Sequence, residues 1–279
     1  MTARLLHGRP LAETINTTSK ARASALELRG LSPRLAVVSV GADPAGNAYA
    51  QRLARAGREL RIDVRHTALS RDTAEGQLVT VLEGLAAERE VNGIILLTPL
   101  PGALDEAHIV DHIAVEKDVE GMHPFNVGFL ADGRPRFVPS TADAIVELLK
   151  FHEIPLRGAH AVVIGRSTVI GRPAAYLLLK EDATVTMAHK QTTDLGRFTR
   201  QADVVVVGVG RERFLTGDML SPGVTVVDAG INVSPAGLRG DVEAESVSRV
   251  AGALSPVPGG LGAVTVALLL RNVLSAAEK

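Results

Sequence analysis

Residues 160–190 contain the clearest chemical pattern in this chain of 279 residues. An apolar, β-branched run ends at Gly165, a short polar turn with Arg166 and Ser167 follows, and Gly171 opens a helix. Glycine lets the backbone turn tightly, and the unpaired amides and dipole at a helix start favour a phosphate group. The pattern is not a complete G-x-G-x-x-G fingerprint, because Ser167 takes the place of the middle glycine and the spacing is longer. By itself it fits a nucleotide-binding turn and an ordinary α/β connection equally well.

Strand and helix patterns alternate along the whole chain, so this turn belongs to a larger α/β arrangement. A strand, a crossover helix and a second strand imply parallel pairing, with helices covering the sheets. Ligands in such folds bind beyond the carboxyl ends of the strands, where the glycine- and proline-rich loops of this chain fall. The predicted strands cover 35–40, 62–68, 93–97, 161–164, 183–188, 203–208 and 224–230, and the main predicted helices cover 10–29, 47–60, 73–88, 139–152 and 263–277.

Composition narrows the range of functions. A net charge of −1 without long charged runs favours neither nucleic acid nor a membrane surface as a partner. The absence of cysteine excludes disulfides, thiol catalysis and thiolate metal sites. No signal peptide or membrane span is recognisable, so we expect a cytoplasmic protein. The histidines stand singly, without a second ligand at metal spacing, so we expect no bound metal.

Seven stretches of the chain carry recognisable motifs: 37–50, 93–101, 117–128, 162–173, 228–232, 240–242 and 255–272. Together they resemble the methylenetetrahydrofolate dehydrogenase/cyclohydrolase family, in the family's order and at its spacings. The resemblance implies two α/β domains bridged by long helices. A folate-side domain would span 1–139 plus the C-terminal helix 263–279, and a Rossmann-like dinucleotide domain would span 140–262. It also implies a homodimer and NADP-linked oxidation of 5,10-methylenetetrahydrofolate to the methenyl form. In bifunctional members hydrolysis to 10-formyltetrahydrofolate follows.

The resemblance implies a complete cofactor half. The second strand of the unit ends at His189 and Lys190, without the carboxylate that NAD enzymes place on the ribose 2′-hydroxyl. Arg166 and Lys190 would instead form a cationic clamp on a 2′-phosphate, which favours NADP. For Lys190, a solvated loop lysine is the competing interpretation. The positions that match the family's cofactor-binding residues are Gly165, Arg166, Ser167, Gly171, Arg172, His189, Lys190, Gly208, Ile231, Gly262 and Thr265.

The folate half departs from the family pattern. Tyr49 matches the tyrosine that stacks along the aminobenzoate ring of the folate. One helical turn later, Leu53 stands where the family has its catalytic lysine, and Leu97 stands where it has the glutamine that positions this lysine. Glu120 replaces the pterin-binding aspartate, which keeps the charge but moves the carboxylate by one methylene.

These departures lead to three hypotheses. Leucine cannot transfer a proton, whereas two leucines can pack together and keep the pocket dry, so a dehydrogenase with a weak or lost cyclohydrolase step is the leading one. A second is the same scaffold acting on a different substrate. A third is a catalytically silent subunit that binds folate or nucleotide and acts through a partner.

Overall fold

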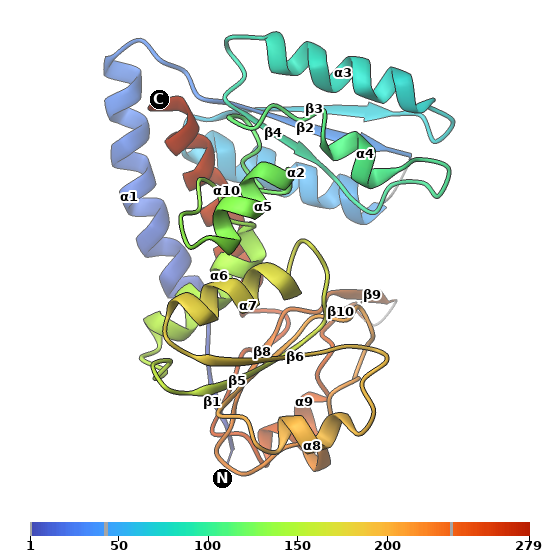
Figure 1. Cartoon of the computed structure of the whole chain (residues 1–279). Coiled ribbons are helices and arrows are strands. Elements are labelled where there is room, and N and C mark those ends of the chain that lie inside the picture. The colour runs from blue at the N-terminus through green and yellow to red at the C-terminus, as the bar shows by residue number, and fades with distance from the viewer. Residues whose placement is uncertain (1, 42–43, 235–236) are drawn as a thin grey trace. The chain divides into compact units, whose positions relative to one another are not determined.

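In the computed structural model, which describes residues 2–41, 44–234 and 237–279, the chain divides into two compact units. Unit 1 contains the N-terminal residues up to Glu13 together with Pro139–Thr265, and unit 2 contains Thr14–Val138 and Val266–Lys279. Helices α1 (Arg9–Leu28) and α10 (Leu261–Ala277) each begin in unit 1 and end in unit 2 (Figure 1).

The first residues of the chain join unit 1, although the sequence analysis assigned them to the folate-side domain. The reason is a parallel pairing of β1 (Arg4–Leu5) with β11 (Ala253–Leu254), which adds an edge strand to the sheet of unit 1. Each of these strands is two residues long, which is too short to leave a readable periodicity.

Unit 2 is built on a three-stranded parallel sheet in the order β3-β2-β4. The central strand β2 (Arg34–Val40) is buried along almost its whole length, as expected for a parallel strand covered on both faces. Helices α2 and α3 lie on opposite faces of this sheet (Figure 1). The other elements of unit 2 are β3 (Asp63–Leu69), β4 (Gly93–Leu96), α2 (Pro44–Glu59), α3 (Glu75–Ala87), α4 (Glu106–Val110) and α5 (Pro124–Ala131).

Unit 1 contains a six-stranded sheet in the order β1-β11-β8-β7-β5-β6, and every neighbouring pair is parallel. From β5 the chain runs to β6 on one side and then returns to β7 on the other. This reversal falls at the carboxyl ends of β5 and β7, the usual place for a ligand in such sheets. Helices α6 and α7 cover one face, and α8 and α9 the other (Figure 1). The elements are α6 (Ser140–Phe151), β5 (His160–Ile164), α7 (Gly171–Lys180), β6 (Thr184–Ala188), α8 (Leu195–Thr199), β7 (Val204–Val207), the 3₁₀ turn η1 (Gly217–Met219), β8 (Thr225–Asp228) and α9 (Ala244–Ser248).

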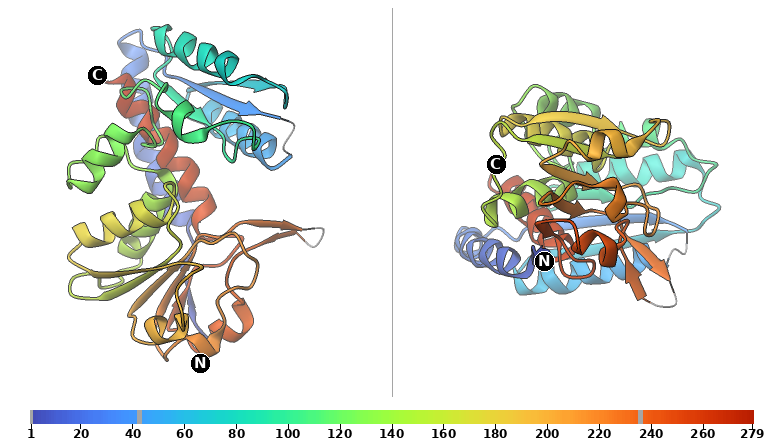
Figure 2. Two further views of the ribbon diagram at one scale, coloured as in Figure 1. Left: turned by 45° about the vertical axis from the view of Figure 1, so that its right-hand side comes forward. Right: turned by 90° about the horizontal axis from the view of Figure 1, so that it is seen from below.

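The predicted fold class is confirmed: both units are α/β with parallel sheets. An antiparallel hairpin of β9 (Asn232–Ser234) and β10 (Gly237–Arg239) was not predicted. It extends away from the sheet of unit 1 (Figure 2). Within the described ranges, the helices are too short or too polar to cross a membrane.

Candidate functional site

Three glycines bring the backbone of unit 1 close together at the carboxyl ends of β5 and β7. Gly165 has a φ of +126°, and a side chain there would collide with the carbonyl oxygen of Gly208, the residue that follows β7. A side chain at Gly171 would in turn collide with the carbonyl oxygen of Gly165. Residues without side chains are therefore required for the turn to close over the end of the sheet.

Ser167 shapes this turn from inside. Its hydroxyl oxygen accepts hydrogen bonds from the amides of Ile170 at 3.1 Å and Gly171 at 3.3 Å, and its carbonyl accepts from Arg172 at 3.1 Å. The first amides of α7 are thus already paired by the serine that replaces the fingerprint's middle glycine. The sequence analysis expected unpaired amides at this helix start, and for Gly171 and Arg172 that expectation is wrong, because Ser167 accepts from both.

Two exposed cations emerge at the same edge of the sheet. Ile164 of β5 is in register with Ala188 of β6, and Arg166 and Lys190 each follow this pair by two residues. Across the parts of the chain that the structure describes, neither side chain has a hydrogen-bonded or ion-paired partner. His189, just before Lys190, forms a hydrogen bond within its own loop: its Nδ1 accepts from the amide of Gln191 at 3.3 Å.

The remaining cofactor candidates also belong to unit 1. Ile231, just after β8, is 60% exposed although it is apolar. Gly262 and Thr265 lie on the first turns of α10, where the Thr265 hydroxyl donates to the carbonyl of Leu261 at 3.2 Å. Arg172 is exposed on the first turn of α7.

Asp228 ends β8 and caps the turn that follows, because its Oδ1 accepts from the amide of Gly230 at 2.9 Å. Burial, together with a smaller effect of the negative charge of Asp241, raises the pKa of Asp228 to about 6, while hydrogen bonds from three backbone amides oppose the rise. The amide hydrogen bonds favour the ionised form but offset only part of the effect of burial.

On the folate side, α2 presents Tyr49 and Leu53 one turn apart. Leu53 is 0% exposed and belongs to the apolar core cluster of unit 2, and Tyr49 and Leu97 pack against the same cluster. Arg52 is exposed, with its guanidinium carbon 5.8 Å from the centre of the Tyr49 ring. The charged neighbour of Leu53 in sequence therefore lies outside the cluster.

The loop that carries Glu120 is fixed by Lys117 and Asp118, whose roles the sequence analysis missed. Lys117 Nζ donates to three carbonyls at the end of α3 and just beyond it, those of Leu85, Ala86 and Glu88. These contacts connect segments about 30 residues apart, so no local pattern announces them. Glu120 itself is partly buried.

Asp118 holds the other side of this loop. It is 1% exposed and accepts from the amides of Met122 at 3.1 Å and His123 at 2.8 Å, and from Asn126 Nδ2 at 2.8 Å. Burial raises the pKa of Asp118 above its ordinary value. The buried aspartate of this motif thus organises the loop that carries Glu120.

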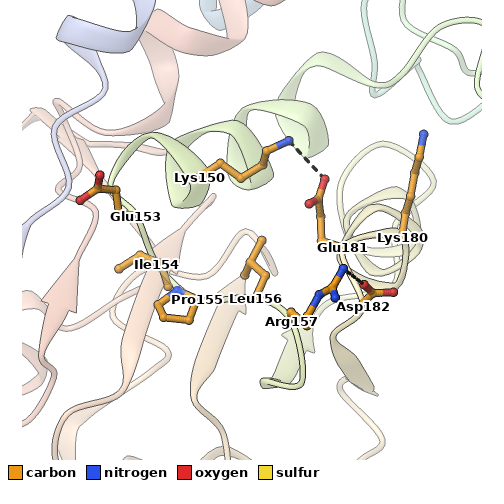
Figure 3. A pocket seen from close by; sticks show the side chains of 9 residues that line it. All are labelled: Lys150, Glu153, Ile154, Pro155, Leu156, Arg157, Lys180, Glu181 and Asp182. Carbon is orange, nitrogen blue, oxygen red and sulfur yellow. Dashed lines mark hydrogen bonds and ion pairs between the residues drawn. The ribbon is translucent and has the colours of Figure 1, made fainter.

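A hollow of about 480 Å³ lies elsewhere on unit 1, between the ends of α6 and α7 and the starts of β5 and β6. Four of its charged lining residues form two ion pairs: Lys150 with Glu181 at 3.3 Å, and Arg157 with Asp182 at 3.0 Å (Figure 3). It lies at the amino ends of the strands, opposite the glycine turn, so it is not the candidate site. Among the described residues, no group of three or more His, Asp or Glu side chains is placed to hold a metal ion.

Two family models match the chain. Residues 6–120 match the tetrahydrofolate dehydrogenase/cyclohydrolase catalytic domain, and residues 139–279 match the NAD(P)-binding domain of the same enzymes. The chain belongs to the tetrahydrofolate dehydrogenase/cyclohydrolase family. The folate-side candidates fall in the range of the first match, and the cofactor candidates fall in the range of the second.

Individual members of this enzyme family match over the full length. Bifunctional protein FolD of Roseiflexus sp. (strain RS-1) is 45% identical over 281 residues, which is 100% of this chain and 98% of the relative. The crystal structure of the bifunctional FolD methylenetetrahydrofolate dehydrogenase/cyclohydrolase from Campylobacter jejuni is 38% identical, with a TM-score of 0.95 and coverage of 99% of each chain. The Trypanosoma brucei dehydrogenase-cyclohydrolase, solved with NADP cofactor and inhibitor, is 30% identical, with a TM-score of 0.95 and coverage of 100% of this chain and 98% of that one.

Proposed function

We propose that this protein is an NADP-dependent 5,10-methylenetetrahydrofolate dehydrogenase in which the cyclohydrolase step is weak or lost. The preference for NADP over NAD is supported by Arg166 and Lys190, which emerge from neighbouring strand ends without a partner among the described residues. An acidic residue that would bind a ribose 2′-hydroxyl is absent at the end of β6. Two cations at one edge suit a 2′-phosphate.

The burial of Leu53 is the observation that supports the loss of hydrolysis. In the family pattern this position carries a lysine that transfers protons and polarises the one-carbon unit. A leucine that is 0% exposed within an apolar cluster offers neither a proton nor a charge. Leu97, at the position of the orienting glutamine, packs against the same cluster, so the two departures agree with each other.

Dehydrogenation depends less on these groups. NADP, when bound, accepts the hydride, and the protein contributes chiefly orientation and proximity. Tyr49 would stack on the folate and Glu120 would bind its pterin ring, while Gly208, Ile231 and Thr265 would line the nicotinamide end. This division of roles predicts that oxidation survives where hydrolysis does not.

The test measures both steps on the native chain. We expect NADP-dependent growth of the methenyl absorbance from 5,10-methylenetetrahydrofolate, and decay of supplied methenyltetrahydrofolate no faster than in buffer. The double variant Leu53→Lys/Leu97→Gln should add hydrolysis. The matched control Leu53→Met/Leu97→Met, which keeps both positions apolar, should not. Robust hydrolysis by the native chain would overturn the proposal.

Binding measurements alongside these assays separate the other hypotheses. NADP binding without tetrahydrofolate binding would indicate a different substrate, and binding of both without turnover would indicate a silent subunit. We also infer a homodimer from the family resemblance, which sedimentation equilibrium would test directly.

A further inference from the structure

Asp241, which has no assigned role in the proposed function, forms the most complete set of hydrogen bonds of any carboxylate near the cofactor loops. It is 0% exposed. Its Oδ2 accepts from the amides of Val209 at 2.6 Å and Gly210 at 2.8 Å. Its Oδ1 accepts from the amide of Arg211 at 2.8 Å and from Asn232 Nδ2 at 2.9 Å. One buried side chain therefore ties the loop after β7 to the loop after β8.

Asp228 holds Asp241 in place from the other side. Its Oδ1 accepts from the amides of Gly230 at 2.9 Å and Asp241 at 3.0 Å, and its Oδ2 accepts from the amide of Val242 at 3.0 Å. The backbone amide of Asp228 donates in turn to Ser255 Oγ at 2.8 Å. The two carboxylates thus connect three loops at the carboxyl edge of the sheet.

The glycines beside these aspartates form a reciprocal fit. A side chain at Gly230, two residues after Asp228, would overlap the carboxyl group of Asp241. A side chain at Gly240, just before Asp241, would overlap the carboxyl group of Asp228. Each of the two sequence stretches, 228–232 and 240–242, therefore contributes an aspartate and makes room for the aspartate of the other.

We propose that Asp241 is a positioning residue for the dinucleotide cofactor, acting through the loop 208–211 and through Asn232. This inference rests on the proposed function, in which Gly208 and Ile231 line the nicotinamide end of the site. Gly208 immediately precedes the three amides that Asp241 binds, and Ile231 immediately precedes Asn232. Releasing the carboxylate would free both cofactor-lining segments at once.

The ionised carboxylate is the group that this arrangement requires, because all four groups that contact it are donors. An asparagine has one carbonyl oxygen and one NH₂ group, so in either orientation two donors would face its NH₂ group. Charge-assisted hydrogen bonds to a buried carboxylate are also stronger than neutral ones. Asp241→Asn therefore keeps the size of the side chain and removes half of its acceptor capacity.

The experiment is calorimetric titration of the full chain with NADPH, together with steady-state kinetics. We expect Asp241→Asn to weaken NADPH binding and raise the KM for NADP by about 10-fold or more, since charged hydrogen bonds of this kind are lost. The KM for methylenetetrahydrofolate should stay within about 2-fold, because the residues proposed to bind it, Tyr49 and Glu120, lie in unit 2. Gly230→Ala should reproduce the effect, because Gly230 has an ordinary backbone conformation and its added methyl group displaces the Asp241 carboxylate.

The matched control is Asp203→Asn, at the amino end of β7, whereas the amides that Asp241 binds follow the carboxyl end of this strand. Asp203 precedes β7 and its Oδ2 accepts a backbone amide, that of His160, at 2.8 Å. This change should leave NADPH affinity unchanged. A purely structural role for Asp241 would lower the active fraction and the melting temperature at an unchanged cofactor KM, and that result would overturn the inference.

Failure of the two proposals can be told apart. If the native chain does not bind NADPH, the proposed function fails. If the native chain binds NADPH and Asp241→Asn binds it equally well, the positioning role of Asp241 fails while the proposed function stands.

Discussion

Replacing Leu53 with lysine tests whether this position is closed to water. Leu53 is 0% exposed, and its core cluster includes Leu35 and Val37 of β2 and Leu270 of α10. These neighbours are apolar and offer no side-chain acceptor to an ammonium group. The variant restores the family's lysine but not the glutamine that positions it, so the effect of a buried amine on the free energy of unfolding can be measured by itself.

The expected cost follows from proton binding. Burial lowers the pKa of a lysine by up to about 5 units, so at pH 7 the buried side chain would be neutral. Deprotonating a lysine of ordinary pKa, about 10.4, at pH 7 costs about 4.6 kcal/mol, because each unit is worth about 1.36 kcal/mol. We therefore expect Leu53→Lys to lower the free energy of unfolding by about 4 to 5 kcal/mol at pH 7.

The loss should shrink as the pH rises. Between pH 7 and about 10 the unfolded lysine holds its proton and the folded one does not, so stability increases with pH by about 1.4 kcal/mol per unit relative to the native chain. Leu53→Met is the control, since it keeps the volume without the amine; it should cost less than about 1.5 kcal/mol and show no such slope.

The assay is urea denaturation followed by far-ultraviolet circular dichroism at pH 7, 8 and 9, since the chain has no tryptophan to report by fluorescence. Adding Leu97→Gln supplies a carbonyl acceptor and should return about 0.5–3 kcal/mol of the loss. If Leu53→Lys costs less than about 1 kcal/mol and its cost does not change with pH, water reaches position 53. The reasoning that links a dry leucine pair to a lost hydrolytic step would then be refuted.

Three further outcomes follow from the structure. The folded-state pKa of Asp228 is raised to about 6, so its contribution to stability is fully present below about pH 4 and is lost as the pH rises through 6. Between about pH 4 and pH 6 the free energy of unfolding of the native chain should fall by about 3 kcal/mol relative to that of Asp228→Asn in urea denaturation. A difference that stays constant with pH would contradict the raised pKa of Asp228. Lys190→Ala should raise the Kd for NADP by about 10-fold in calorimetric titration and leave the Kd for NAD unchanged. The control Lys180→Ala should change neither Kd. Equal effects of Lys190→Ala on both cofactors would argue against a 2′-phosphate clamp. Gly171→Ala should lower the free energy of unfolding by about 1–3 kcal/mol and weaken NADPH binding, because the added methyl group meets the Gly165 carbonyl. In the control Gly76→Ala the methyl group enters open space, so NADPH binding should be unchanged and stability unchanged or slightly improved.

Local patterns were sufficient for the main elements of the fold. The apolar runs that became β2, β5, β7 and β8 and the glycines that bound them are short-range signals, and each predicted strand formed close to its predicted position. The alternation of strands and helices then required parallel sheets, because a crossover helix returns the chain in the same direction. The resemblance of the motifs likewise pointed to the family without knowledge of the fold.

Several features of the site depend on contacts between distant parts of the chain. Leu53 is sealed from water by α10 residues more than 200 positions away, and a sequence reports the substitution but not the burial. The pairing of β1 with β11 rests on two residues in each strand, which leave no periodicity to detect.

Asp241 shows the distinction most clearly. Its type and its neighbouring glycine are visible in the sequence, but its four donors come from residues 209–211 and from Asn232. A carboxylate can accept from whichever donors the fold brings within reach, so its partners have no sequence signature. The sequence by itself determined which elements form and which family they compose. The tertiary structure alone decided which buried groups hold the loops after β7 and β8, because hydrogen bonds and burial depend on distances in space.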